Sequence, residues 1–251
     1  MGARRQHPTV NRARTCSLPV VCVVASTLIW MHGPSISAQN PTAVPARLEA
    51  LDQAPLKQYR AYRRMHAVNE KFNKEAWLEA WTELDEHGFR YEIVSERGSE
   101  YVLNKVLKNV LAHEQELIRQ GQSGRAELTA DNYVFEEAQA AGKGVRYILL
   151  KPKRKDMLLV DGRMVLNQSG TELLRVEGRL SKNPSFWTSL VNIIRDFANL
   201  DGVRVPVTTE TIAKLKFAGV ARMVVQYEYD TINGRPVSLT ARRTLAAAIG
   251  R

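Results

Sequence analysis

The chain has 251 residues, of which 44% are hydrophobic and 25% are charged, and its formal net charge is +10. A chain of this length can bury a core that is stable without cross-links. Both cysteines, Cys16 and Cys22, lie in the first 38 residues, so a mature chain lacking that segment has no disulfide and no thiol chemistry.

The first 38 residues have the pattern of a secretory signal. Basic residues (Arg4, Arg5, Arg12 and Arg14) precede an apolar stretch from Leu18 to Met31, and small residues lead to a cleavage point after Ala38. The apolar stretch is shorter than the roughly 20 residues of a spanning helix, so a membrane anchor is the weaker alternative. Cleavage lowers the net charge by four, to +6. We therefore expect a periplasmic protein, and export argues against a nucleic-acid partner.

The next elements are a short helix between Pro45 and Pro55, and a first strand from Tyr59 to Ala67. The segment Glu75–Leu84 is ambiguous, because its composition favours a helix while its alternation favours a strand. A turn at residues 85–88 and a clearer strand from Phe89 to Val94 favour strand–turn–strand.

The best helix spans Ser99–Gln120. Its apolar residues recur at helical spacing, with Ser99 as a candidate N-cap and Gly121 as a candidate stop. The stripe contains Leu103, Val106, Leu107, Val110, Leu111 and Leu117.

After this helix the pattern predicts strands at Tyr133–Ala138, Val145–Lys151 and Met157–Val160, and then an antiparallel meander from Asp161 to Tyr229. Apolar residues at spacings of four and three (Trp187, Val191, Ile194 and Phe197) predict a short helical insert within it. Pro206 indicates an edge strand or a bulge. The expected turn dipeptides are Asp161-Gly162, Asp201-Gly202 and Asn233-Gly234.

These elements predict one α+β domain, residues 39–238, followed by a loose basic tail, residues 239–251. Three stretches carry a resemblance to a known family: 158–162 (LLVDG), 176–187 (VEGRLSKNPSFW) and 201–206 (DGVRVP). They resemble the bacterial outer-membrane lipoprotein-sorting proteins, the LolA/LolB-like half-barrels, and the likeness covers roughly residues 45–234 in element order.

The resemblance implies a curved antiparallel sheet that forms an incomplete β-barrel covered by helices, with an apolar cavity for lipid or lipoprotein acyl chains. The helix Ser99–Gln120 has the place of the lid. In such carriers an arginine near the start of the fold helps to hold the closed state. Arg60, Arg63 and Arg64 are all candidates for that role, and the sequence does not choose among them.

Two groups of residues are candidates for ligand contact. The first group would line an apolar cavity, and its alternative is a filled core. The second group would contact an anionic membrane surface through its lysines and arginine, and its alternative is a solvated hairpin tip. The cavity candidates are Trp77, Trp81, Leu103, Leu107, Leu111, Trp187, Val191, Phe217 and Met223, and the membrane-surface candidates are Lys151, Lys153, Arg154 and Lys155.

Catalytic chemistry is not indicated. Residues 113–117 (HEQEL) begin like a zinc-protease helix, but Leu117 stands where the second histidine is needed, and no nucleophile elbow is present. We predict no catalytic residue, no metal and no cofactor. The prediction is a monomeric, non-enzymatic lipid-binding protein of the cell envelope. The alternatives are an envelope sensor that docks a protein partner and, with less support, a hydrolase.

Overall fold

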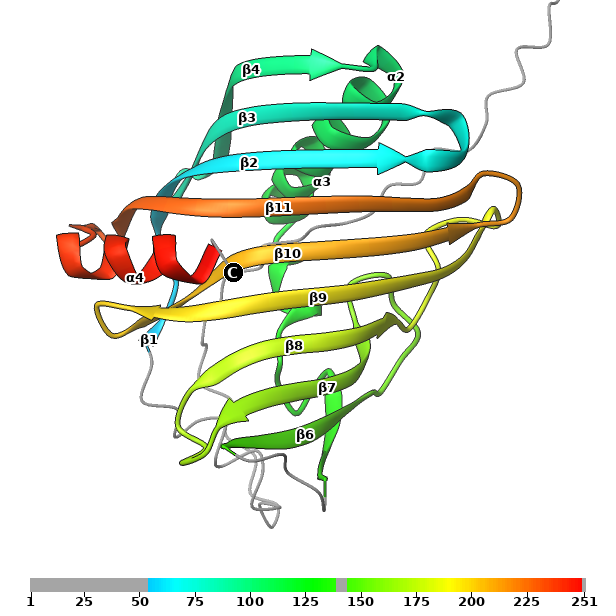
Figure 1. Cartoon of the computed structure of the whole chain (residues 1–251). Coiled ribbons are helices and arrows are strands. Elements are labelled where there is room, and N and C mark those ends of the chain that lie inside the picture. Colours follow the sequence, from blue (N-terminus) through cyan, green and yellow to red (C-terminus); the bar gives the residue numbers. More distant parts are fainter. Residues whose placement is uncertain (1–53, 139–143, 250–251) are drawn as a thin grey trace, which may run out of the picture.

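The protein is described by a computed structural model over residues 54–138 and 144–249. The predicted signal segment and most of the predicted helix between Pro45 and Pro55 lie outside these residues. Twelve strands in the described residues form one open sheet, in the order β4-β3-β2-β11-β10-β9-β8-β7-β6-β5 with β1 and β12 at its side (Figure 1). All pairs are antiparallel except β1 with β10. The curved antiparallel sheet is therefore confirmed.

β1 (Ala54–Pro55) is a short strand at the end of the predicted helix and was not predicted. The next three strands and their hairpins follow the predicted alternation. They are β2 (Tyr59–Asn69), β3 (Lys74–Asp85) and β4 (Gly88–Gly98), with a 3₁₀ turn at Glu70–Phe72. The ambiguous segment is a strand, as favoured above, because β3 pairs along its length with both β2 and β4 and buries every second residue. Tertiary pairing outweighs the helical composition here.

The predicted helix is confirmed as one continuous rod of three parts: α2 (Glu100–Val102), a π-helical turn (Leu103–Leu107) and α3 (Lys108–Arg119). Ser99 makes no side-chain cap, but its carbonyl accepts from Leu103 N at 2.9 Å. Gly121 ends the helix with φ 65°, and Gln122 N donates to Leu117 O at 2.9 Å, as in a Schellman ending.

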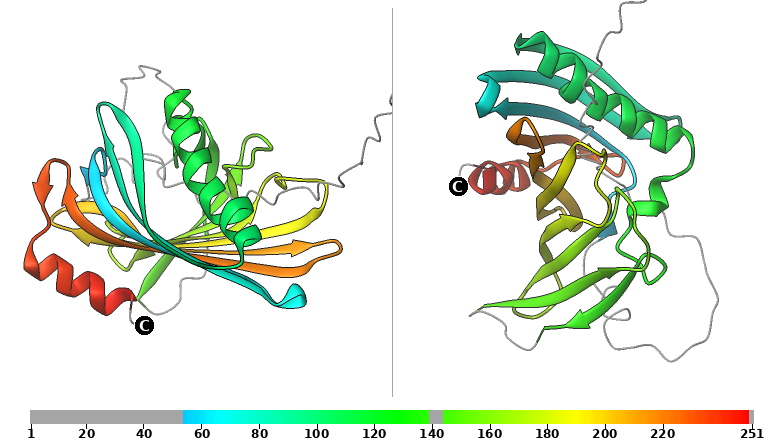
Figure 2. Two further views of the ribbon diagram at one scale, coloured as in Figure 1. Left: turned by 90° about the horizontal axis from the view of Figure 1, so that it is seen from above. Right: turned by 90° about the vertical axis from the view of Figure 1, so that its right-hand side faces the viewer.

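The rest of the chain is mostly sheet. A 3₁₀ turn (Ser123–Ala126) leads to β5 (Tyr133–Glu137), β6 (Val145–Pro152), β7 (Val160–Asn167), β8 (Leu173–Leu180), β9 (Thr188–Leu200), β10 (Val203–Leu215), β11 (Gly219–Ile232) and β12 (Arg235–Pro236), and then to the helix α4 (Leu239–Ile249). The rod lies on the concave side of the sheet and packs mainly against β2, β3 and β4, while α4 lies on the opposite side (Figure 2). The expected cover of several helices is thus wrong for the concave side, which the described residues cover with one helix.

The predicted helical insert is strand β9. Val191 pairs with Ala213, and Ile194 pairs with Glu210, so β9 is hydrogen-bonded along its length to β10. Val191 and Phe197 lie on one face of the strand and Ile194 on the other. Apolar residues on both faces of a strand produced spacings that imitate a helical stripe.

Three further predictions are corrected or refined. Asp161-Gly162 is not a turn, because it lies inside β7, and the predicted strand Met157–Val160 is a turn that leads into β7. Pro206 marks a bulge, since the register of the central strand β10 shifts between Pro206 and Thr208. Such bulges increase the curvature of a sheet. The two remaining dipeptides, Asp201-Gly202 and Asn233-Gly234, are turns with positive φ at both residues.

The predicted loose tail is a packed helix as far as Ile249. Ser238 begins it, because its Oγ accepts from Ala241 N at 3.2 Å and donates to the Asp201 carboxylate at 2.7 Å. Ala241 and Leu245 are buried, and α4 packs against β9, β10 and β11. The basic side chains of this segment had indicated a tail, but its apolar residues supply a buried face.

Gly162 lets two strands approach closely. A Cβ at this position would lie 2.1 Å from the carbonyl oxygen of Glu177 and 2.6 Å from the Cα of Gly178, which are both backbone atoms. We expect Gly162→Ala to lower the free energy of unfolding by about 1–3 kcal/mol, the usual cost of overpacking. Urea denaturation measures this. The matched control is Gly124→Ala, where only a flexible side-chain atom lies within 4 Å; equal stability of the two variants would contradict the close approach.

Candidate functional site

A buried ion pair joins the helical rod to the concave face of the sheet. Arg63 on β2 donates from Nη1 to Glu114 Oε2 at 2.6 Å and from Nη2 to Glu114 Oε1 at 3.0 Å, and each side chain is 1% exposed. Tyr59, four residues earlier on the same face of β2, accepts from Arg63 Nη2 and donates to Glu114 Oε1 at 3.5 Å. A bidentate arginine–carboxylate pair fixes both distance and orientation.

Aromatic rings surround this ion pair. The Arg63 guanidinium carbon lies 5.0 Å from the ring centre of Tyr227 and 5.1 Å from that of Phe89. Burial lowers the pKa of Arg63, but the Glu114 carboxylate more than offsets this, so that the pKa is raised. The Arg63 guanidinium is therefore held charged inside an otherwise apolar interface, and this arrangement depends on its remaining beside Glu114.

Of the nine cavity candidates, five lie in the concave core. Leu103, Leu107 and Leu111 come from the rod and are at most 6% exposed. Met223 on β11 pairs with Ala67, and Val191 on β9 pairs with Ala213, so both lie on the concave face. All five belong to one hydrophobic cluster between the rod and the sheet.

The other four candidates lie elsewhere, which corrects the idea of one common lining. Trp77 and Trp81 alternate with the buried residues of β3 and so lie on the convex face. His66 stacks on Trp77 with ring centres 4.8 Å apart, and Arg60 lies 4.3 Å above Trp81. Trp187 and Phe217 are exposed at the ends of hairpins. Aromatic residues were assigned to the interior by type, whereas the strand alternation had already placed Trp77 and Trp81 opposite to Ala76 and Leu78.

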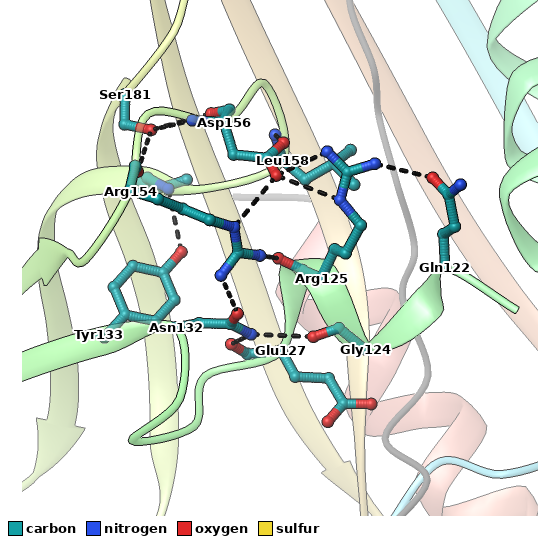
Figure 3. A network of polar contacts seen from close by, with 11 residues as sticks. Gln122, Gly124, Arg125, Glu127, Asn132, Tyr133, Arg154, Asp156, Leu158 and Ser181 are labelled. Atoms are coloured by element: carbon teal, nitrogen blue, oxygen red, sulfur yellow. Dashed lines mark hydrogen bonds and ion pairs between the residues drawn. The ribbon is translucent and has the colours of Figure 1, made fainter.

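A polar network anchors the segment that follows the rod. Asp156 is 4% exposed and accepts from Arg125 Nη2 at 2.7 Å, and its backbone N donates to Ser181 Oγ at 2.9 Å (Figure 3). Burial raises the pKa of Asp156, but the hydrogen bonds from Arg125 and Leu158 N outweigh it and lower the pKa. The network connects the turn after the rod to the β6–β7 connection and the end of β8.

The four membrane-surface candidates lie in the same region but differ in their contacts. Arg154 belongs to the network, because it donates to Asn132 Oδ1 at 2.7 Å and to Arg125 O at 3.0 Å. Lys151 forms an ion pair with Glu136 at 2.7 Å. Lys153 and Lys155 are exposed and form no ion pair with a described residue. A role for this group at a membrane stays a prediction.

The sequence contained a signal for the ion pair that the sequence analysis did not use. Strand alternation places Arg63 on the buried face of β2, together with Tyr59, Ala61 and Met65. Arg60 and Arg64 fall on the other face of this strand. Glu114 likewise lies within the apolar stripe of the rod. A lone charge on each of two apolar faces predicts that the two meet, because neither can be buried alone.

The described residues contain no group of three or more His, Cys, Asp or Glu side chains that could hold a metal ion. None of their helices is long and apolar enough to cross a membrane. A groove of about 230 Å³ on the convex face is lined by Val68, Glu70, Glu210, Ile212, Val220 and Arg222, and contains none of the predicted cavity residues.

The chain is similar to two solved structures. One is a LolA superfamily protein from Nitrosomonas europaea, with a TM-score of 0.36 and 11% identity over 73% of this chain and 90% of that chain. The other is a DUF1329 family protein from Desulfovibrio piger, with a TM-score of 0.32 and 11% identity over 75% of this chain and 91% of that chain. No family model and no curated protein matches the sequence. The first match bears the superfamily name that the sequence resemblance indicates, but neither match assigns a function to this chain.

Removing one partner of the ion pair takes the bidentate hydrogen bonds away from the other charge, which stays buried. We expect Glu114→Gln, Glu114→Leu and Arg63→Met each to lower the free energy of unfolding by about 3–5 kcal/mol, and the double variant Arg63→Met with Glu114→Leu to lose much less than the sum of its two single variants. Urea denaturation of the four proteins in this cycle measures the coupling.

The matched control is the exposed pair Arg64–Glu228 on the convex face, directly beside the buried pair. Glu228→Gln should change the stability by less than about 1 kcal/mol, as for exposed pairs in general. Equal effects of Glu114→Gln and Glu228→Gln would show that the buried pair does not hold the rod.

Proposed function

We propose that this protein binds the acyl chain of a lipid or lipoprotein in the periplasm, between the concave face of the sheet and the helical rod, without catalysing a reaction. The observation that carries the proposal is the junction itself. One helix packs on an apolar face, and within the described residues the one fully buried ion pair between that helix and the sheet is Arg63–Glu114. A helix attached in this way can move as a unit when the pair opens.

The concave face supplies the apolar surface that such a ligand needs. The concave face continues beyond the rod through Val225 on β11, Val176 on β8, Met164 on β7 and Ile148 on β6. All four side chains are at most 6% exposed, so they are packed in the described state. An acyl chain gains about 0.8 kcal/mol for each buried CH₂. A chain of twelve carbons would therefore gain on the order of 9 kcal/mol before the costs of ordering it and of moving the rod.

The rod is packed on the sheet in the described state, which favours entry of a ligand only after the rod has moved. Leu107 and Leu111 fill the interface between rod and sheet in the described state. A ligand must displace them, and the free energy needed is reduced because Arg63 and Glu114 regain water when the pair separates. The predicted export signal agrees with a periplasmic carrier, although that segment lies outside the described residues.

The proposal is tested by probe displacement on the exported, purified protein. We expect saturable binding of the apolar fluorophore N-phenylnaphthylamine, and its displacement by laurate, together with lipid co-purifying in native mass spectrometry. The double variant Arg63→Met with Glu114→Leu keeps an apolar junction without charges, and we expect its probe exchange rate to change. Glu228→Gln is the control that should exchange as the wild type does.

Absence of both saturable probe binding and co-purified lipid would refute acyl-chain binding. Retention of a defined envelope protein on the immobilised chain, without lipid, would instead favour the sensor function considered in the sequence analysis.

A further inference from the structure

A second arginine lies on the concave face, near the ion pair but outside it. Arg195 of β9 is opposite Thr209 of β10, and Thr209 is opposite Val225 of β11. Val225 lies two residues before Tyr227, the cross-strand partner of Arg63. Residues that are paired or two apart share a face. Arg195 and Arg63 therefore lie on the concave face in neighbouring cross-strand rows.

Arg195 lacks the kind of partner that Arg63 has. Its one hydrogen bond to a described residue runs from Nε to Thr209 Oγ1 at 3.4 Å, and no described carboxylate forms an ion pair with it. Both oxygens of Glu114, the nearest acid to act on it, already accept from Arg63. Burial lowers the pKa of Arg195, but a guanidinium remains charged at physiological pH.

The surroundings of Arg195 are ready to accept an anion. Val176 lies opposite Arg195 on β8, and Ile193 is its neighbour on the same face of β9. The hydroxyl groups of Tyr227 and Thr211 are buried on this face without a hydrogen bond of good geometry, although Thr209 lies close to Tyr227. A partly exposed cation on this face, beside unsatisfied donors, favours a ligand that brings negative charge.

We propose that Arg195 binds the anionic head of the acyl ligand, a carboxylate or phosphate, while the chain lies on the apolar wall of the concave face. The planar fork of a guanidinium matches the two oxygens of either group. The ligand class is thus an anionic amphiphile such as a fatty acid or an acidic phospholipid. This inference rests on the proposed acyl-chain binding and adds the charge of the ligand to it.

The test uses two ligands of the same chain length, one with a charged head group and one with a neutral head group. Laurate and 1-dodecanol have chains of equal length, and each displaces N-phenylnaphthylamine from the full chain at pH 8. Arg195→Gln should weaken laurate binding by about ten- to hundredfold, the range for a charge-assisted hydrogen bond, and leave dodecanol binding unchanged. Arg195→Lys should restore part of the difference. Arg175→Gln is the control, because Arg175 is half-exposed and already paired with Asp196.

The outcomes separate the inference from the function on which it depends. If both ligands bind but Arg195→Gln weakens them equally, or weakens neither, the head-group site is wrong and acyl binding stands. If neither ligand binds to the wild type, both are wrong. Inorganic phosphate and acetate are added as anions without a chain. If they compete as well as laurate does, Arg195 is a site for free anions, which also overturns the proposal. Circular dichroism melting confirms that each variant is folded.

A separate observation concerns one end of the sheet, where hairpin tips expose large aromatic side chains. Phe186 and Trp187 lie between β8 and β9, and Phe217 lies between β10 and β11, with the Trp187 ring centre 5.5 Å from each of the other two. Phe186 is 76% exposed and Phe217 68%. Phe72, in the β2–β3 turn, is also exposed, and its neighbour Lys71 donates to the carbonyl of Phe217 at 2.7 Å. We call these four aromatic residues the aromatic rim.

The aromatic rim is surrounded by lysines. Lys216 Nζ lies 3.7 Å from the ring centre of Phe186. Five lysines and two glutamates, Glu70 and Glu75, are on these tips or within two residues of their strand ends, and none of the lysines forms an ion pair with a described residue. The five are Lys71, Lys74, Lys182, Lys214 and Lys216.

We infer that the aromatic rim docks this end of the molecule on an anionic bilayer. Aromatic rings are favoured at the depth of lipid headgroups, and lysine stems can lie along apolar surface while their charges contact phosphate. A protein partner could cover the aromatic rings, but five lysines without an ion-pair partner beside two glutamates favour a surface of uniform negative charge. The cluster Lys151–Lys155 lies at the same end of the sheet, because the β6–β7 connection is next to the end of β8.

Vesicle sedimentation tests the docking with the full chain. Vesicles of phosphatidylcholine with 30% phosphatidylglycerol should bind it more tightly than pure phosphatidylcholine. Lys214→Gln with Lys216→Gln should weaken binding to the anionic vesicles by about fivefold for each lysine, and Phe186→Ser with Phe217→Ser should weaken it by at least about tenfold. The control, Lys57→Gln with Arg235→Gln at the opposite end of the sheet, where β2 begins and β11 ends, should bind as the wild type does.

The inference fails if the wild type does not sediment with anionic vesicles, or if the control loses as much binding as the rim variants. It also fails if the rim variants bind vesicles normally but lose a protein from envelope extract, since the rim would then dock a protein.

Discussion

The position of the helical rod depends on one buried ion pair. Arg63 and Glu114 come from elements far apart in sequence, and each is a lone charge on an otherwise apolar face. Neither could be buried alone without a large desolvation cost, so each face accepts its charge only when the other is opposite. The apolar contacts of Leu107 and Leu111 stabilise the contact between rod and sheet, and the bidentate pair fixes its register and orientation.

The two faces of the sheet have different chemistry because strands alternate. The concave face is mostly apolar, with Arg63, Tyr227 and Arg195 among its few polar side chains, whereas the convex face carries cross-strand ion pairs such as Arg175–Asp196 and Arg222–Glu210. Exposed pairs of this kind contribute little to stability but keep the face soluble. The concave face is therefore the one suited to an apolar ligand, and its charges are the exceptions that can select among such ligands.

The sheet, the long helix and most strand positions could be predicted from local patterns. Periodicity failed where both faces of a strand are apolar, as in β9, because Val191 and Ile194 then reproduce a helical spacing. It also failed at Gly162, where a residue typical of turns serves instead to let two strands approach closely. In each case the pairing of distant strands, which no local window contains, outweighed the local preference.

The sequence by itself determined which residues alternate and where the amphipathic helix begins and ends, because these follow from side-chain spacing along one element. The same alternation places Arg63 on the face of β2 opposite to Arg60 and Arg64, and Trp77 and Trp81 on the face of β3 opposite to Ala76 and Leu78. The sequence did not determine that Arg63 meets Glu114, or that no described acid forms an ion pair with Arg195. Those properties depend on which face of which strand lies opposite another element. Only the tertiary structure decides that, since the free energy of a buried charge depends on neighbours distant in the chain.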